Sequence, residues 1–154
     1  MTRHQLKLRR AGTTDAEAVR ALTRQAYAKW IESIGREPRP MTADYRKAVR
    51  AHWIDLHEEN GILVALIEVI PRPDHLLVEN IAVRGSHQGL GIGGALLDHA
   101  ARLAAAHGLG ELRLYTNAAF LANLRFYRSR GFAETARTPL AGGGTMVHFA
   151  KPVS

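Results

Sequence analysis

The sequence predicts a single domain of the mixed α/β (α+β) class. Two helix-like segments come first, a meander of strands joined by tight turns follows, and helix and strand then alternate. The 154 residues can bury an ordinary hydrophobic core without disulfides, and no linker, repeat or low-complexity segment divides them. We therefore expect one domain over residues 1–154.

The N-terminal segment is expected to contain an edge strand and a helix. Leu6 and Leu8 alternate with charged residues, as in a half-exposed strand. Thr14 and Glu17 have the spacing of a capping box, in which a hydroxyl and a carboxylate satisfy backbone N–H groups at a helix start. Apolar residues at helical spacing then extend this helix to about Trp30.

A break and a second helix follow. Glycine and proline interrupt the helical pattern over residues 35–40. Thr42 can cap a second helix that carries Tyr45 and Val49 on one face. The segment 38–45 can form the rim of a substrate site or serve simply as a connector.

Two turn signals predict an antiparallel meander. Asn60-Gly61 is the strongest two-residue hairpin signal, and a proline-rich turn follows at residues 71–74. The expected strands are 53–57, 62–70 and 76–83.

The second half of the chain alternates helix and strand. Gly131 should adopt the left-handed conformation that ends a helix. The expected elements are a helix over 91–107, a strand over 112–115, a helix from Phe120 through Tyr127, and strands over 132–138 and 145–150.

Composition narrows the functional classes. Without cysteine the chain has no disulfide framework, zinc–thiolate site or thiol nucleophile. The formal charge of +7 favours anionic partners, but the basic residues are scattered, which argues against nucleic-acid binding. The segment 1–10 lacks an apolar signal-peptide core and no run reaches membrane-spanning length, so we expect a cytoplasmic protein without a membrane partner.

A glycine-rich loop between an expected strand and an expected helix indicates phosphate binding, because a helix N-terminus presents free N–H groups. Gly89, Gly91 and Gly94 fit the G-x-G-x-x-G fingerprint of dinucleotide-binding folds, with Glu111 as the candidate ribose-binding acid. However, residues 84–88 separate these glycines from the strand, and Glu111 precedes its own strand. No Gly-Lys-Ser/Thr follows, which excludes a Walker A loop.

A second interpretation fits the chain better. Gln88-x-x-Gly91-x-Gly93 resembles the acyl-CoA signature of the GNAT N-acetyltransferase superfamily, (R/Q)-x-x-G-x-(G/A). The segment 123–132, NLRFYRSRGF, resembles the N-x-x-x-Y-x-x-x-G-F segment of that family. The expected order of elements is similar over nearly the whole chain. Gly85 departs from the family, where proline often follows the strand; this loosens the connector and leaves the phosphate loop intact.

The resemblance implies the GNAT fold, a central, mostly antiparallel, splayed sheet of about seven strands flanked by about four helices. It implies acetyl-CoA as cosubstrate, with the pyrophosphate at the helix N-terminus and the acyl arm along the strand before the loop. A strand-end N–H near Ile81 would polarise the thioester carbonyl. The implied cofactor-binding residues are Ile81, Ala82, Val83, Gln88, Gly89, Leu90, Gly91, Ile92, Gly93, Gly94, Asn123 and Tyr127.

Direct transfer suits a chain without cysteine: the amine attacks, a tetrahedral intermediate forms and CoA leaves. A lysine-like amine is only about 0.1% neutral or less near pH 7, so a base must help, and the leaving thiolate benefits from an acid. The resemblance makes Tyr127 the acid, although its helical spacing also fits a core aromatic. Glu79 interrupts an apolar alternation with Leu77, Ile81 and Val83, so it either faces a cleft as a base acting through water or is paired.

No metal is expected, because the eight histidines form no ligand-like cluster. His52 and His57 flank a predicted helix–strand junction, and His87 either helps to bind phosphate or is a solvated loop residue.

The predicted function is acetyl transfer from acetyl-CoA to a primary amine. A longer acyl-CoA donor, a CoA-binding regulatory module without turnover and a basic nucleic-acid-binding protein remain alternatives. The segments 38–45 and 142–144 are expected to flank the amine site. The acceptor is unassigned, although the positive charge disfavours polyamines and basic tails. The resemblance is compatible with a homodimer.

Overall fold

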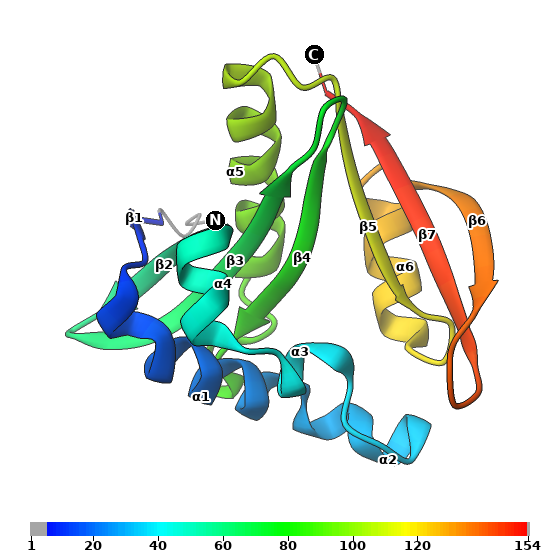
Figure 1. Ribbon diagram of the computed structural model, residues 1–154, viewed down its shortest axis with the longest axis horizontal. Coiled ribbons are helices and arrows are strands. Elements are labelled where there is room, and N and C mark those ends of the chain that lie inside the picture. Colours follow the sequence, from blue (N-terminus) through cyan, green and yellow to red (C-terminus); the bar gives the residue numbers. More distant parts are fainter. Residues whose placement is uncertain (1–5, 154) are drawn as a thin grey trace.

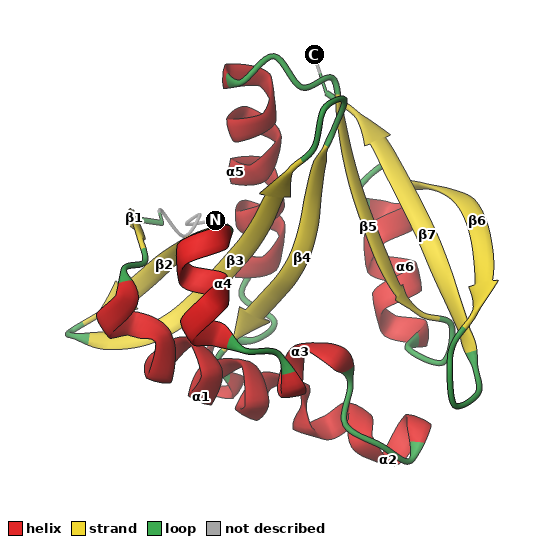
Figure 2. Ribbon diagram, in the orientation of Figure 1, coloured by secondary structure: helices red, strands yellow, loops and turns green. Residues whose placement is uncertain are grey.

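The computed structural model describes residues 6–153 and contains a seven-stranded sheet with helices on both faces (Figures 1 and 2). Residues 1–5, part of the segment in which we expect no signal-peptide core, and residue 154 lie outside the described part. The strands are β1 (Leu8–Arg10), β2 (Trp53–Glu59), β3 (Ile62–Pro71), β4 (Leu76–Val83), β5 (Glu111–Asn117), β6 (Ala133–Pro139) and β7 (Thr145–Pro152). The helices are α1 (Ala16–Tyr27), α2 (Ile31–Ile34), α3 (Arg39–Thr42), α4 (Tyr45–Ala51), α5 (Ile92–Ala106) and α6 (Leu121–Ser129).

The sheet order, β1-β2-β3-β4-β5-β7-β6, confirms the predicted mixed, mostly antiparallel architecture. The predicted edge strand is β1, and Asn60 and Gly61 form the predicted turn, with φ of 54° and 76°. These two positive φ angles match the right-handed twist of the flanking strands. The four longer helices are those expected, and the one-turn helices α2 and α3 add to them.

The first helical segment differs from the prediction at both its start and its end. Before α1, the Asp15 carboxylate accepts the Gly12 N–H at 2.8 Å around a 3₁₀ turn, so the capping residues are not Thr14 and Glu17. The first helical segment also continues past Trp30 through α2, where a left-handed glycine ends it.

The cap of α4 is Asp44, not Thr42. The Asp44 carboxylate accepts two backbone N–H groups of the first turn, at 3.1 and 3.3 Å. Thr42 ends the separate short helix α3. Tyr45 and Val49 are both buried, as their spacing predicted.

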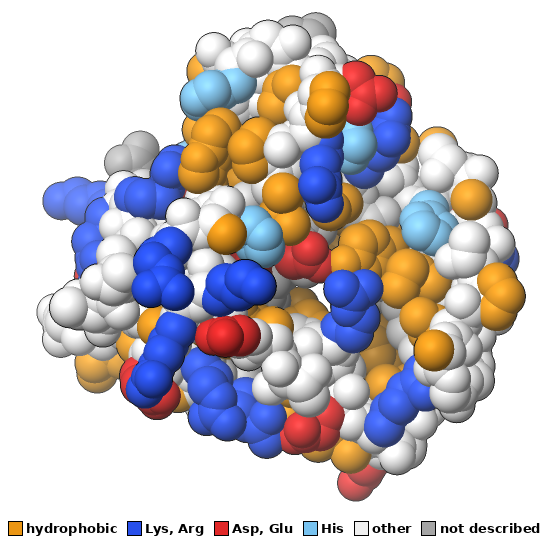
Figure 3. Space-filling view, viewed as in Figure 1, with side chains coloured by type: hydrophobic (Ala, Val, Ile, Leu, Met, Phe, Trp, Pro, Cys, Tyr) orange, Lys and Arg blue, Asp and Glu red, His pale blue; other side chains and the backbone are white. Residues whose placement is uncertain are grey.

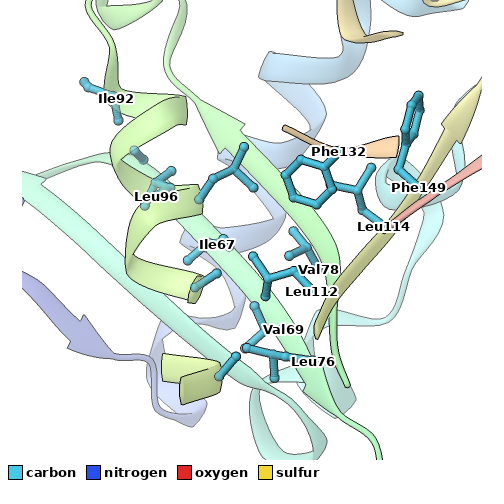
Figure 4. Close-up of a cluster of buried hydrophobic side chains, with 14 of the residues drawn as sticks. Ile67, Val69, Leu76, Val78, Ile92, Leu96, Leu112, Leu114, Phe132 and Phe149 are labelled. Atoms are coloured by element: carbon cyan, nitrogen blue, oxygen red, sulfur yellow. The ribbon is translucent and has the colours of Figure 1, made fainter. Parts of the chain in front are cut away.

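Each face of the sheet has its own hydrophobic core. α1 and α4 cover one face, and α5 and α6 cover the other (Figure 1). Figure 4 shows the larger cluster, in which Ile92 and Leu96 of α5 pack toward Ile67 and Val78 of the sheet. The two cores hold the helices against both faces of the sheet, so the site is formed at the edges of the strands.

β4 and β5 are held together at one end only. Their parallel pairing consists of Leu76 with Leu112 and Leu77 with Arg113, at the start of both strands. Beyond these residues the strands diverge toward their carboxyl ends, as Figure 1 shows. The sheet is therefore splayed, as the resemblance implied.

A buried carboxylate joins β1, β2 and α5. Asp55 is 5% exposed, and its two oxygens accept Arg10 Nε and His99 Nε2, each at 2.7 Å. Burial raises the pKa of Asp55, but the hydrogen bonds from His99 and Arg10 outweigh it and hold that pKa below its usual range. The charged form of Asp55 therefore stabilises the fold.

Asp55→Asn should lower the free energy of unfolding near pH 7 by about 1–3 kcal/mol, because hydrogen bonds to a buried charge are lost. A depressed folded-state pKa contributes stability that is present above the ordinary aspartate pKa and lost as pH falls through the folded value. Denaturant titration should therefore show the difference in unfolding free energy between wild type and variant shrinking as the pH falls below the ordinary aspartate pKa. The exposed control Asp74→Asn should change stability much less, and an equal loss in both variants would contradict this role of Asp55.

Candidate functional site

A cavity of about 540 Å³ lies where β4 and β5 separate. Figure 3 shows this face of the molecule hollowed near its centre, with acidic, basic and hydrophobic side chains around the hollow. The lining comes from β4, β5, α6, the segment 34–42 and the end of β6 with the loop that follows it. The cavity thus connects the layer of α6 with the opposite face of the sheet.

β4 contains an extra residue at Glu79. The pairing with β3 passes from Val78 to Asn80 and leaves Glu79 without a partner on β3. Val78 belongs to the core under α5, whereas Asn80 faces α1, because a bulge moves the following side chains to the other face. The predicted alternation on one face from Leu77 to Val83 is therefore wrong.

The bulge places Glu79 in the cavity. Its Oε1 accepts a hydrogen bond from the Tyr115 hydroxyl across the gap between β4 and β5. Burial raises the pKa of Tyr115, and the Glu79 carboxylate raises it further, so the phenol keeps its proton. The Arg39 guanidinium carbon lies 5.8 Å from the centre of the Tyr115 ring.

Tyr127 and Asn123 bring α6 to the same cavity. The Tyr127 ring packs with three phenylalanines of the core, yet its side chain also lines the cavity. Within residues 6–153 its hydroxyl makes no hydrogen bond. Burial raises the pKa of Tyr127 to about 12, so the hydroxyl is protonated at neutral pH. Both interpretations of its spacing thus describe part of its environment.

The glycine loop leads directly into α5. Gly89 and Gly91 have φ of 79° and 86°, a region that favours glycine, and Gly91 precedes the first helical residue. The Gln88 side chain folds back onto the Val83 carbonyl at 3.0 Å, and Lys29 Nζ lies 3.3 Å from its Oε1. The first N–H groups of α5 have no helical acceptor and are free to bind an anion.

Arg130 packs against the first turn of α5. One of its terminal nitrogens donates to the Gly94 carbonyl and to Asp98, both at 3.1 Å. A Cβ at position 94 would lie 2.8 Å from the guanidinium carbon. Gly94 thus allows a cation to approach this turn closely.

Side chains hydrogen-bond to two backbone carbonyls at the edge of β4 beyond the splay, those of Ile81 and Val83. The Ile81 carbonyl accepts the Tyr27 hydroxyl at 3.1 Å. The N–H and C=O of one strand residue point to the same edge, so the Ile81 N–H also faces the gap. Ile81 and Ala82 lie opposite Ile67 and Leu66 of β3, but the backbone N–H and C=O of Ala82 point toward β3, and Ala82 is buried in the core under α1.

A second cavity of about 280 Å³ adjoins the first, and Glu79 and Asn80 line both. Its floor contains Glu68, which is 3% exposed and lies 2.5 Å from His52 Nδ1. Burial raises the pKa of Glu68 despite the opposing effect of His52. The buried Asn80 Oδ1 has no hydrogen-bond partner among the described residues.

Arg36, which lies outside the predicted segment 38–45, joins the two sides of the larger cavity. None of the residues 142–144, which were expected to flank the amine site, lines this cavity. The terminal nitrogens of Arg36 donate to the carbonyls of Ala141 and Gly143 at 3.2 and 2.9 Å. This contact ties the segment between α2 and α3 to the loop between β6 and β7. Of the predicted segment 38–45, Pro38 to Pro40 and Thr42 line the cavity.

Sequence reasoning missed Tyr115, Arg39 and the pair of Glu68 with His52. Tyr115 could have been found, because it lies at the carboxyl end of a strand parallel to β4, where ligands of α/β sheets bind. The other two histidines named in the sequence analysis line neither cavity: His57 and His87 each contact Glu59 at 3.1 Å. Among residues 6–153, no three His, Cys, Asp or Glu side chains form a group suited to a metal ion.

A mixed sheet that splits between β4 and β5, with a glycine loop leading into α5, defines the acyltransferase class that the motifs resemble. The sequence profile described as the Acetyltransferase (GNAT) family matches residues 17–132, and the chain belongs to that family. It is therefore a GNAT acetyltransferase enzyme. No curated protein matches the sequence.

Solved structures share the fold over nearly the whole chain. A GCN5-related N-acetyltransferase from Rhodopseudomonas palustris has a TM-score of 0.83 and 17% identity, with 99% of each chain covered. A putative GNAT acetyltransferase from Desulfovibrio desulfuricans has a TM-score of 0.78 and 20% identity, covering 97% of this chain and 100% of that one. A GNAT acetyltransferase from Elizabethkingia anophelis, with acetyl-CoA bound, has a TM-score of 0.71 and 16% identity, covering 96% and 98%. No helix within residues 6–153 is both long and apolar enough to cross a membrane.

Proposed function

We propose that this acetyltransferase moves an acetyl group from acetyl-CoA to a primary amine by direct attack. The observation that carries the proposal is the cavity through the β4–β5 split, which meets Tyr127 on one side and Glu79 on the other. Donor and acceptor can therefore approach one reaction point from opposite faces of the sheet. A cytoplasmic location and a homodimer remain predictions from the sequence.

The glycine loop is the proposed seat of the CoA pyrophosphate. Backbone N–H groups from Gln88 to Gly94 would bind the phosphates at the positive end of α5, and Lys29 and Arg130 add charge nearby. The acyl arm would lie along the free edge of β4, where the Ile81 N–H can donate to the thioester oxygen as negative charge develops.

Tyr127 and Glu79 are the proposed acid and base. Tyr127 keeps its proton at neutral pH and has no internal acceptor within the described residues, so its hydroxyl can donate to the leaving sulfur. Glu79 lies on the acceptor side, where a water can carry the proton of the amine to its carboxylate. Tyr115 holds this carboxylate in place.

Gly91→Asp should raise the Kd for CoA at least about tenfold, because a carboxylate at the helix N-terminus repels the pyrophosphate. Calorimetry with CoA measures the effect. Gly91→Ala controls for the strain of a side chain at positive φ, and Gly110→Asp places the same charge beyond the other end of α5. An unchanged Kd in Gly91→Asp would remove the loop from the CoA site.

Tyr127→Phe should lower kcat about 100-fold or more while the KM for acetyl-CoA changes little, because only the proton donor is lost. Since the pKa of Tyr127 is raised to about 12, the wild type should show no loss of this acid as pH rises toward about 11. Initial rates of CoA release test both expectations. Wild-type activity in the variant would leave Tyr127 as a core residue only.

Glu79→Gln should also lower kcat by about 100-fold, because the amide cannot accept a proton. CoA affinity should stay at the wild-type value, which calorimetry can verify. Tyr115→Phe removes the hydroxyl that holds Glu79 and should cause a smaller loss. If Glu79→Gln retains full kcat with a primary amine, another group acts as the base.

A further inference from the structure

The acceptor side of the larger cavity contains positive charge without a matching carboxylate. Glu37 forms an ion pair with Arg24 at 2.6 Å, and Glu79 accepts the Tyr115 hydroxyl. Among the described residues, Arg36 donates only to backbone carbonyls, so no carboxylate neutralises its charge there. Arg24 thus neutralises Glu37, while Glu79 keeps its negative charge. The guanidinium groups of Arg36 and Arg39 then leave the described lining with an excess of one positive charge.

Arg39 is the cation best placed to bind a ligand. It lines the cavity, is exposed and has no ion pair or hydrogen bond from its side chain within residues 6–153. Its guanidinium lies over the Tyr115 ring, whose hydroxyl contacts Glu79. A guanidinium over the ring and a carboxylate at the hydroxyl therefore contact the same tyrosine, and all three side chains line the cavity.

We propose that the acceptor is an amine that also carries a carboxylate, in the manner of an amino acid. Its carboxylate binds the Arg39 guanidinium, whose planar fork matches two carboxylate oxygens, and its ammonium group lies beside Glu79. This inference rests on the proposed function, since it names the substrate class of that site.

One apolar part of the lining can bind an apolar side chain of this acceptor. Phe120 stacks on Trp30 with ring centres 4.3 Å apart, and Leu140 and Met146 extend the apolar wall. Such surfaces bind apolar or aromatic groups by removing them from water. The acceptor is thus an amino acid with an apolar or aromatic side chain.

The reaction is balanced with this acceptor. The ammonium loses a proton through water to Glu79, and its nitrogen attacks the thioester carbon. The C–S bond then breaks, and the sulfur leaves as the CoA thiol with the proton donated by Tyr127. As the amide forms, the second proton of the nitrogen passes through water to restore the Tyr127 hydroxyl, and the proton held by Glu79 is released to solvent. The acceptor carboxylate takes no part in the chemistry and only fixes the position of the amine.

Three acceptors of nearly one shape test the proposal: phenylalanine, phenylalanine amide and 2-phenylethylamine. The full chain is assayed with acetyl-CoA by thiol release, and products are identified by mass spectrometry. The kcat/KM for phenylalanine should exceed that for each analogue without a carboxylate about tenfold or more, because a charge-assisted contact is lost in the analogues.

Variants of Arg39 test whether this residue causes the preference for an acceptor with a carboxylate. Arg39→Gln should lower kcat/KM for phenylalanine about tenfold, mainly through KM, and affect 2-phenylethylamine much less. Arg39→Lys keeps the charge but loses the fork and should give an intermediate value. Arg46→Gln, on α4 outside both cavities, is the control and should match the wild type.

The outcomes separate this inference from the proposed function. Equal use of the three acceptors, or an equal loss for all of them in Arg39→Gln, overturns the carboxylate site and leaves amine acetylation standing. Transfer to 2-phenylethylamine alone would likewise overturn the carboxylate site and leave amine acetylation standing. If none of the three amines is acetylated, the result counts against both.

Discussion

The two-residue parallel contact between β4 and β5 is the constraint on which the rest of the site depends. If the strands paired further, no passage would exist between the two helical layers. Because they do not, the edge of β4 needs other partners, since buried backbone polar groups are costly when unpaired. Tyr27 and Gln88 supply two of them, at Ile81 and Val83. The same divergence therefore opens the cavity and requires the side chains that border it.

The bulge at Glu79 decides which polar side chain reaches the cavity and which enters the core. After the inserted residue, Asn80 faces α1 and donates to Thr23 and Tyr45. Glu79 instead reaches across to Tyr115. Without the extra residue, Asn80 would face the apolar core under α5, where a polar side chain lacks partners. The bulge thus reconciles a polar pair of residues with a sheet that is buried on both faces.

The sequence indicated most of the elements because their periodicity is local. Turn signals at Asn60-Gly61 and Gly131 depend on the conformations of single residues, and they too could be read directly. The caps were harder, since Thr14 and Asp15 are both good capping types, and the choice depends on where the 3₁₀ turn begins. Nothing local marks the bulge, which follows from register with β3.

The residues of the candidate site also fall into two groups: those that local motifs predict and those that only the fold brings together. The glycine loop and Tyr127 follow from motifs with fixed spacing, so the sequence could name them. Tyr115 and Arg39 belong to segments far from β4 in sequence, and only the parallel contact and the path of α3 bring them beside Glu79. The strand-end position of Tyr115 could be read from the sequence, but the contacts of Tyr115 with Arg39 and Glu79 produce no periodic pattern in it.

At the open end of the splayed sheet, Arg36 joins the two sides of the cavity by hydrogen bonds. The halves β1–β4 and β5–β7 share a short backbone contact at one end, and the two hydrogen bonds of Arg36 link the rims at the other. Two such bonds contribute about 1–3 kcal/mol together. The Tyr115–Glu79 hydrogen bond and the stacking of Trp30 on Phe120 join the same two halves across the gap. The open end of the sheet is therefore closed by side-chain contacts instead of strand pairing, so substitutions in these side chains can change the cavity without changing the sheet.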